Sequence, residues 1–259
     1  MEGIKANNFV VVGRVGMDLF PANGVATEDA DNFTADMGGS SANIAAGIVK
    51  LGGKAALVTC VSDDAVGRFC RNKLAHYGVD ATYVKSVGGE ARNSLALYES
   101  RVQGHQSVIY RNGAADFEMT VADVEAVDYS RFGALVTAGT VFAAEPSRTA
   151  AFRAFELART AGLPVIFDVD YRPYSWPSAE VAEEVLSRAA AMRARARRMA
   201  SSKSAASSTA SGGRGLPCRP YNSRNRPVPE GPSRMPLKSI HSFCLAKVGR
   251  SALSALTTT

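Results

Sequence analysis

Short apolar runs rich in β-branched residues alternate with amphipathic helical segments along the first 190 residues, and this order limits the possible folds more than any other feature of the chain. Apolar runs predict buried strands at 9–12, 54–64, 133–142 and 163–176, the last with its loop. Helices are predicted within 37–53 and over 65–79, 146–162 and 178–192, the last capped by Ser178. Apolar strands that alternate with helices predict an α/β fold with a doubly wound, mostly parallel sheet.

The segment 93–111 departs from this order. Its apolar residues alternate on either side of a turn at Gln103 and Gly104, which predicts a β-hairpin with partly exposed faces. Because the hairpin interrupts the strand–helix order, we expect it to belong to a separate small sheet. The residues between the first strand and Asp36 are interpreted as a polar connecting stretch.

The composition changes abruptly near Met192. Residues 1–190 contain 17 Lys and Arg against 23 Asp and Glu, whereas residues 191–259 contain 13 Lys and Arg against one acid, Glu230. The overall charge of +6 therefore averages an acidic body and a basic tail. The tail is rich in Arg, Ser, Gly and Pro, and it has too few large apolar residues to offset the entropy cost of ordering. We therefore expect it to be disordered.

No feature of the sequence indicates export or a membrane. The first residues lack the apolar run of a signal peptide, and no run reaches the roughly 18 apolar residues that a membrane span needs. The four cysteines form no CxxC pair and are expected to be free thiols. We expect a cytoplasmic protein with no membrane partner. Nucleic acid is an unfavoured partner because no aromatic residues interleave the basic ones, and a basic-tailed interaction protein stays open as an alternative.

The stretch MGGSSANIAAGIVKLGG (37–53) opens a predicted helix with two glycines, two serines and an asparagine. Gly38 and Gly39 permit close approach of the backbone to a ligand, and Ser40 or Ser41 can cap the helix. The phosphate-binding spacing G-x-x-x-x-G-K-[ST] is absent. The stretch therefore favours binding of hydroxyl groups, with a glycine turn and cap that bind nothing as the alternative.

Asp18 follows the first predicted strand, within VVGRVGMDLF. Open α/β sheets bind ligands at the carboxyl ends of their strands, and a carboxylate there can accept hydrogen bonds from two sugar hydroxyls. A dinucleotide-binding turn is disfavoured because the G-x-G-x-x-G spacing is absent, and Phe20 and Pro21 stand where its helix should begin. The alternative role for Asp18 is to cap nearby backbone amides.

The residues GGSSANIAAGIVKLGGKAALVTCVSDDAVGR (38–68) closely resemble the N-terminal signature of the ribokinase-like (PfkB) sugar kinases, and GRVGMDL resembles that family's first sugar-contacting loop. The resemblance covers about residues 8–190. It implies that Asp18 and Asn43 bind sugar hydroxyls and that the paired glycines form a hinge beside the substrate. It also implies ATP with Mg²⁺ as the phosphoryl donor and transfer to the terminal hydroxyl of the sugar.

The resemblance extends to the organisation of the chain. Segments near 14–36 and 90–115 are expected to form a small β lid. The expected domains are then the N-terminal part of a ribokinase-like kinase at 1–190 and a basic low-complexity tail at 191–259.

Two further segments, IYRNGAAD (109–116) and FDVDYRPYSW (167–176), resemble family members whose substrates are keto-sugar acids. The resemblance implies that Arg111 and Arg172 meet the carboxylate or the phosphate side of the substrate, with Asp170 beside them. A planar guanidinium recognises a carboxylate through paired hydrogen bonds. A surface ion pair is the alternative for each arginine. The implied partner is a small keto-sugar acid, and a homo-oligomer is left open.

The resemblance ends near Met192, whereas the family continues with further strands and helices. That part of the family carries a G-A-G-D-like motif, whose amides stabilise the transferred phosphate and whose aspartate is the catalytic base, and it forms most of the ATP site. No such motif follows Met192 in this chain. We therefore expect a chain without catalytic base or ATP site, poorly soluble, with a frameshift near codon 192 as the origin of its tail. A sugar-binding remnant is the alternative to an active kinase.

Overall fold

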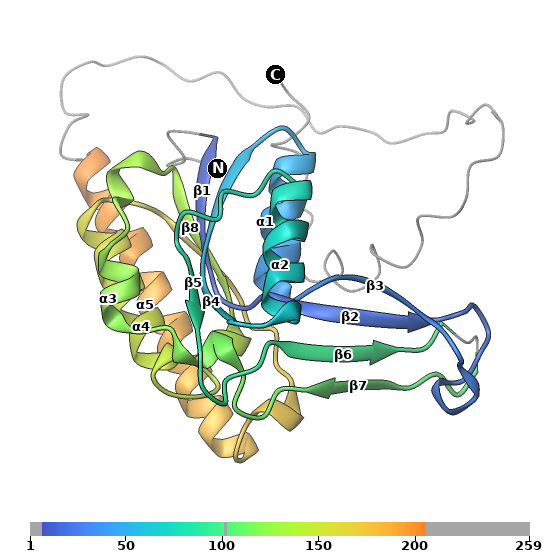
Figure 1. The fold of residues 1–259 in the computed structure, drawn as a ribbon. Coiled ribbons are helices and arrows are strands. Elements are labelled where there is room, and N and C mark those ends of the chain that lie inside the picture. The colour runs from blue at the N-terminus through green and yellow to red at the C-terminus, as the bar shows by residue number, and fades with distance from the viewer. Residues whose placement is uncertain (1–6, 101–102, 206–259) are drawn as a thin grey trace, which may run out of the picture. The chain divides into compact units, whose positions relative to one another are not determined.

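The computed structural model describes residues 7–100 and 103–205, with side chains described as far as Arg193. By their contacts the residues divide into one unit of Gly3–Ala206 and a second of Met1–Glu2 with Ser207–Thr259. Only the first unit falls within the described residues, and Figure 1 shows its fold. From residue 206 onward, the disorder expected for the tail lies outside the described residues.

A five-stranded parallel sheet forms the centre of this unit, and the sequence predicted four of its strands but not the one at Val84–Val87. Its strands are β1 (Asn8–Val12), β4 (Lys54–Ser62), β5 (Val84–Val87), β8 (Ala134–Ala138) and β9 (Val165–Asp168). They pair in the order β5-β4-β1-β8-β9, and every pair is parallel. β1 is the middle strand because its valines are buried on both faces of the sheet, as an interior parallel strand requires.

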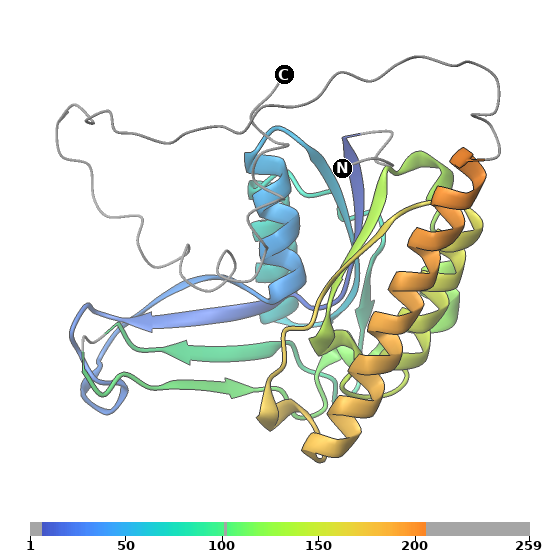
Figure 2. The ribbon, with the colours of Figure 1, turned by 180° about the vertical axis from the view of Figure 1, so that it is seen from behind.

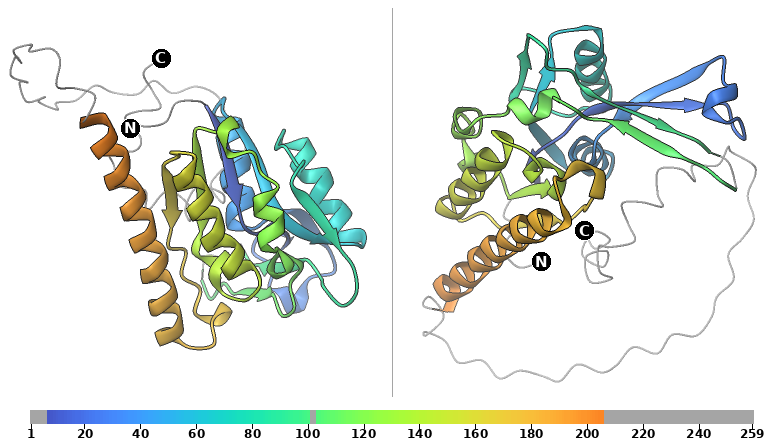
Figure 3. Two further views of the ribbon diagram at one scale, coloured as in Figure 1. Left: turned by 90° about the vertical axis from the view of Figure 1, so that its left-hand side faces the viewer. Right: turned by 90° about the horizontal axis from the view of Figure 1, so that it is seen from below.

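Helices cover both faces of the sheet, which confirms the doubly wound architecture (Figures 2 and 3). The helices are α1 (Ser40–Lys50), α2 (Ala65–His76), α3 (Val121–Glu125), α4 (Ser147–Thr160) and α5 (Ala179–Ala205). Because side chains alternate along β1, Val10 and Val12 join the apolar cluster beneath α4 and α5, and Val11 joins the cluster beneath α1 and α2. Short 3₁₀ turns, η1 to η5, lie at Thr27–Asp29, Ala115–Glu118, Tyr129–Arg131, Gly139–Phe142 and Pro173–Ser175.

The DDAVGR segment shows how the signature residues form the junction between β4 and α2. Asp64 is the N-cap of α2, and its carboxylate accepts hydrogen bonds from the amides of Val66 and Gly67, both at 2.9 Å. A Cβ on Gly67 would lie 1.8 Å from the carbonyl oxygen of Ser62, so only glycine lets the helix pack this closely on the strand. The motif therefore fixes the helix at the carboxyl end of β4.

A second, four-stranded sheet projects from one end of the central sheet (Figure 1). Its strands are β2 (Gly16–Pro21), β3 (Phe33–Gly38), β6 (Ser94–Tyr98) and β7 (Ser107–Tyr110), in the order β3-β2-β6-β7. β6 and β7 are the predicted hairpin, paired from Leu95 opposite Tyr110 to Tyr98 opposite Ser107. We call this second sheet the lid.

Several elements differ from the sequence predictions, and β5 and α3 were not predicted. The polar stretch before Asp36 contains the paired strands β2 and β3, and β3 continues to Gly38. The strand predicted at 133–142 ends at Ala138, because Gly139 packs against the backbone of Val169 and turns the chain into a 3₁₀ helix. Helix α5 continues past Met192 to Ala205, through Ala and Arg residues that favour helix.

Candidate functional site

Asp18 lies on β2 at the base of the lid, directly opposite Asp36 of β3. Burial raises the pKa of the Asp18 carboxyl to about 6, the charge of Arg14 acts in the opposite direction, and the charge of Asp36 raises it further. Neither an ion pair nor a hydrogen bond to another described residue occupies its carboxylate oxygens. The alternative role, in which Asp18 caps backbone amides, is therefore absent from the described structure.

Gly38 and Gly39 connect β3 to α1 next to Asp18. A Cβ on Gly38 would lie 1.8 Å from the Asp18 Oδ1 atom, so glycine leaves the room that the carboxylate occupies. Gly39 has φ of +98° and is the N-cap of α1, and a Cβ there would lie 2.5 Å from the Arg14 carbonyl oxygen. Glycine is therefore required at position 38 by the close approach of the Asp18 carboxylate, and at position 39 by the positive φ.

The start of α1 differs from the expectation that Ser40 or Ser41 caps it, because no side chain caps this helix. Ser41 is fully buried and donates to the carbonyl of Val12 at 3.2 Å. The Ser40 hydroxyl lies 3.2 Å from the Thr140 hydroxyl on η4. Asn43 is in the first turn and exposed, and its side chain makes no hydrogen bond to the described residues, so it is available to a ligand.

Arg111 follows β7 and is buried at 7% exposure, which contradicts the alternative of a surface ion pair. Its Nη2 atom donates to the Asp116 carboxylate and, at 3.0 Å, to the carbonyl oxygen of Thr140. Its guanidinium lies 4.2 Å from the ring centre of Phe117. The Nε and Nη1 atoms have no hydrogen-bond partner although they are buried. Two donors of Arg111 are therefore held in place without an acceptor.

Asp170 and Arg172 lie in the loop after β9 and form an ion pair with each other at 2.8 Å. The Asp170 side chain is buried, whereas that of Arg172 is 37% exposed. Asp170 has φ of +34°, which is uncommon for a residue other than glycine and marks a constrained loop. In this loop Trp176 is buried, while Tyr171 and Tyr174 are exposed.

Electrostatic coupling indicates that the predicted residues share one region. The pKa of Tyr174 is raised by burial, and the charges that act on it come from Arg172, Arg14, Asp170 and Arg111. The pKa of Tyr98 on the lid is raised by burial and by Asp18, against the effects of Arg14 and Arg172. The lid base, the end of β7 and the loop after β9 therefore surround one charged region at the carboxyl ends of β1, β8 and β9.

Arg14 is the residue in this region that the sequence did not single out as a site residue. It is 8% exposed, its Nη1 atom donates to the Ser94 hydroxyl at 3.0 Å, and its Nε atom has no partner. Its position four residues before Asp18 is the feature of the sequence that could have indicated a site residue. An arginine that follows a strand is ordinarily exposed to solvent, however, so the sequence did not predict its burial. Only the tertiary structure reveals that it is buried.

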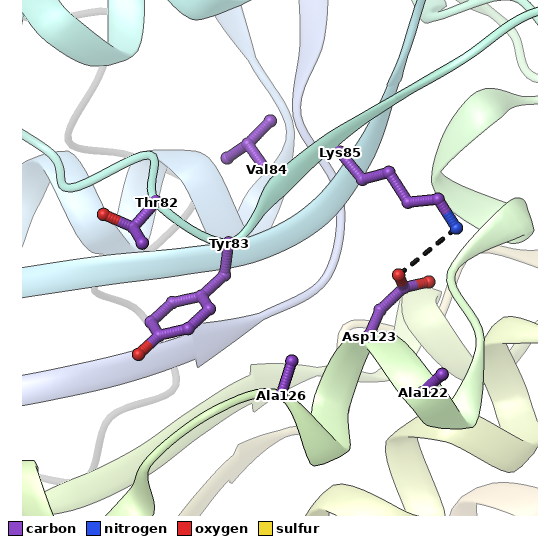
Figure 4. Close-up of a pocket in the computed structure, with 7 residues that line it drawn as sticks. All are labelled: Thr82, Tyr83, Val84, Lys85, Ala122, Asp123 and Ala126. Atoms are coloured by element: carbon purple, nitrogen blue, oxygen red, sulfur yellow. Dashed lines mark ion pairs between the residues drawn. The ribbon is translucent and has the colours of Figure 1, made fainter.

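The groove shown in Figure 4 is not this region. It is lined by Thr82–Lys85 and by Ala122, Asp123 and Ala126, with an ion pair of 3.3 Å between Lys85 and Asp123. Within the described ranges, no group of His, Cys, Asp and Glu side chains is arranged to hold a metal ion. None of the described helices combines the length and apolar character that a membrane span requires.

Comparison with solved structures identifies the class of fold. A fructokinase from Xylella fastidiosa matches with a TM-score of 0.63 at 24% identity, over 70% of this chain and 57% of its own. A fructokinase from Halothermothrix orenii matches with a TM-score of 0.60 at 26% identity, over 70% of this chain and 65% of its own. The fold is that of the ribokinase-like sugar kinases.

Sequence comparison gives the family. The model of the pfkB family of carbohydrate kinases matches residues 6–198, and the chain belongs to this family. Two curated relatives are named 5-dehydro-2-deoxygluconokinase. The one from Photobacterium profundum is 38% identical and aligns over 64% of this chain and 51% of its own length. The one from Geobacillus kaustophilus is 37% identical and aligns over 68% of this chain and 53% of its own length. The segments AGTVFAAEPSR (138–148) and DYRPYSW (170–176) resemble this subgroup most. The chain spans about half the length of these relatives.

Proposed function

We propose that the described part of this chain is the sugar-binding half of a kinase that phosphorylates the terminal hydroxyl of 5-dehydro-2-deoxygluconate or a similar keto-sugar acid. The observation that carries the proposal is the half-buried, unpaired Asp18 carboxylate beside Gly38, in one charged region with Arg111 and Arg172. The names of the curated relatives support the substrate class.

Each of these residues is suited by its chemistry to bind a different part of the sugar acid. Asp18 is an acceptor for two sugar hydroxyls, and above pH 6 it is mainly the carboxylate that this role needs. Asn43 offers an exposed amide at the first turn of α1. Arg111 is held in a fixed orientation by Asp116 and Thr140 and has two unused donors, which suit it to bind an acidic group.

The family implies ATP as the phosphoryl donor, and an ATP complex of the Xylella fructokinase is among the structural matches. ATP with Mg²⁺ supplies the transferred phosphoryl group when bound. The described residues do not fit this group, because they contain neither a metal-binding cluster nor a G-A-G-D-like motif. We therefore assign the described residues to sugar binding and no phosphoryl-transfer step to them.

The test is phosphorylation of 5-dehydro-2-deoxygluconate by the 259-residue chain with MgATP, detected by mass spectrometry. We expect no product from this chain and product from a chain whose reading frame is restored after residue 190. Product from the 259-residue chain would instead mean that it is an active kinase and that residues 191–259 supply a base and an ATP site.

The frame-shifted origin of residues 191–259 has a test of its own in the coding DNA. We expect one of the other two frames downstream of codon 192 to encode a G-A-G-D-like motif. Absence of such a motif in both frames would contradict this origin. The interaction-protein alternative would be favoured by salt-dependent nucleic-acid binding that deletion of residues 191–259 abolishes.

A further inference from the structure

Two buried arginines from different segments have unused donors in the same region. Arg14 follows β1 and Arg111 follows β7, and they are 8% and 7% exposed. Three of their nitrogen atoms, Arg14 Nε and Arg111 Nε and Nη1, are buried without a hydrogen-bond partner. Such unpaired buried donors are costly, and a native structure rarely keeps three of them together without a use.

Strand pairing brings the two guanidiniums to the same end of the lid. Arg14 donates to the Ser94 hydroxyl, and because Leu95 pairs antiparallel with Tyr110, Ser94 and Arg111 are the next residues on the two strands. Burial lowers the pKa of Arg111, Asp116 opposes this, and the positive charge of Arg14 lowers it further. Arg111 has a carboxylate partner, whereas no described acidic side chain lies within ion-pair distance of Arg14. Arg14 therefore has no described carboxylate in direct contact, although the charge of Asp18 acts on it from nearby.

The neighbouring backbone holds both arginines near the start of α1. The carbonyl oxygen of Arg14 accepts from the Ala42 amide of α1 at 3.2 Å. Thr140 accepts from Arg111 through its carbonyl oxygen and contacts Ser40 through its hydroxyl. Arg14 and Arg111 thus flank the first turn of α1, the turn that also presents Asn43.

We propose that Arg14 and Arg111 form one binding subsite for the carboxylate of the sugar acid, and that Arg14 determines the preference for acids over neutral sugars. The inference rests on the proposed function and adds a residue to it. Paired guanidinium donors match the two oxygens of a carboxylate. One further atom fits this ligand: Asp116 Oδ1 is buried without a donor and would accept from a hydroxyl of the same molecule.

The donors are buried in this structure, so a ligand reaches them only when a covering segment moves.

The experiment measures binding of 5-dehydro-2-deoxygluconate, its neutral C1 amide and inorganic phosphate to the 259-residue chain by calorimetry. The wild-type chain should bind the acid about 10- to 100-fold more tightly than the amide. Arg14→Gln should lower the affinity for the acid to about that for the amide, and Arg14→Lys should restore part of the difference. The comparison of acid with amide in the wild-type chain needs no variant, so it stands even if Arg14→Gln fails to fold.

Each outcome has a distinct meaning. Equal affinity for acid and amide in the wild-type chain would overturn the subsite and leave sugar binding intact. An acid preference that survives in a folded Arg14→Gln chain would overturn the role of Arg14. Tighter binding of phosphate than of the acid, lost in Arg14→Gln, would identify a phosphate site instead. Binding of none of the ligands would contradict the proposed function itself.

Discussion

Asp18 and Asp36 face each other across the lid base, yet their pKa values move in opposite directions. Burial dominates at Asp18 and raises its pKa from 3.8 to about 6. Burial also raises the pKa of Asp36, but Lys73 at 3.0 Å, the Met37 amide and the Tyr77 hydroxyl outweigh it and lower the value. The protein therefore holds one aspartate in a neutralised pair and the other without a partner.

This contrast predicts a pH-dependent stability. Because the pKa of Asp18 is higher in the folded chain, the folded state binds more protons between about pH 4 and 6, and the free energy of unfolding falls as pH rises through this window. Asp18→Asn should remove the effect and raise the free energy of unfolding at pH 7 by up to about 3 kcal/mol. Urea titrations at pH 4 and pH 7 measure it.

The matched control is Asp36→Asn, on the opposite strand. The stability that Asp36 contributes is present above its ordinary pKa of 3.8 and is lost as pH falls through the lowered value. This variant should therefore be less stable than the wild-type chain at pH 7. If Asp18→Asn also lost stability at pH 7, the carboxylate of Asp18 would be stabilising the fold and would not be an unpaired group kept for a ligand.

Gly39 and Gly47 give opposite predictions for the same substitution. Gly39→Ala forces a Cβ to within 2.5 Å of the Arg14 carbonyl at φ of +98°, and should lower the free energy of unfolding by about 1–3 kcal/mol. Gly47→Ala, within α1 and with open space at its Cβ, should raise it by roughly 0.5–1 kcal/mol. Chemical denaturation of both variants compares them directly. Equal effects would contradict the geometry of the β3–α1 connection.

At the scale of elements, one buried amide joins the lid to the central sheet. Asn93 precedes β6, and its Oδ1 accepts from the amide and the hydroxyl of Ser62 at 2.7 and 2.8 Å. Its Nδ2 donates to the carbonyl of Val15 at 3.1 Å. A single side chain therefore connects the end of β4, the β1–β2 passage and the start of β6.

Loss of this amide should loosen the lid. Asn93→Ala leaves the Ser62 amide and the Val15 carbonyl unpaired in a buried position, which should cost roughly 2–4 kcal/mol. Faster hydrogen exchange in β2 and β6, measured by mass spectrometry, should accompany it. The control is Ser100→Ala, which removes an exposed hydrogen bond to Asn23 in the lid and should change little. Unchanged exchange in Asn93→Ala would mean that strand pairing alone holds the lid.

The sequence predicted the elements that have a clear pattern of apolar residues within one segment. It missed the strands that form only by pairing with residues distant in the chain. β1, β4 and α2 follow from apolar runs and caps that lie within one segment. β2 and β3 do not, because GMDLFP and FTADMG mix polar residues with a proline and become strands only by pairing with each other and with β6.

The same limit applies to the site. The resemblance supplied Asp18, the paired glycines and Arg111, since each stands in a motif. Arg14 was missed because its burial depends on Ser94 of β6, 80 residues away in the chain. The side-chain cap expected at Ser40 or Ser41 was wrong because both hydroxyls have tertiary partners, the Thr140 hydroxyl for Ser40 and the Val12 carbonyl for Ser41.

At the scale of the whole molecule, the central sheet ends at β9, which pairs with β8 on one side and with no other described strand. Beyond it Val169 and Tyr171 are 49% and 41% exposed. Because open strand edges pair with one another, we expect the chain to form oligomers that grow with concentration in sedimentation experiments.

Val169→Lys should shift this equilibrium toward the monomer, because a charge beside the edge opposes pairing. Leu51→Lys is the control: Leu51 is more exposed, at 72%, but lies at the end of α1 and away from the edge. A monodisperse monomer at all concentrations would contradict the expectation, and an equal effect of both substitutions would indicate nonspecific association.

The central place of β1 has a consequence for the order of events on the ribosome. β1 is made almost first, yet Phe9 pairs with Ala134, which is synthesised 125 residues later. At 5–20 residues per second, the growing chain waits about 6–25 s for that neighbour. During this interval one edge of β1 has no partner, so we expect newly made chains to be prone to aggregation until β8 has been synthesised.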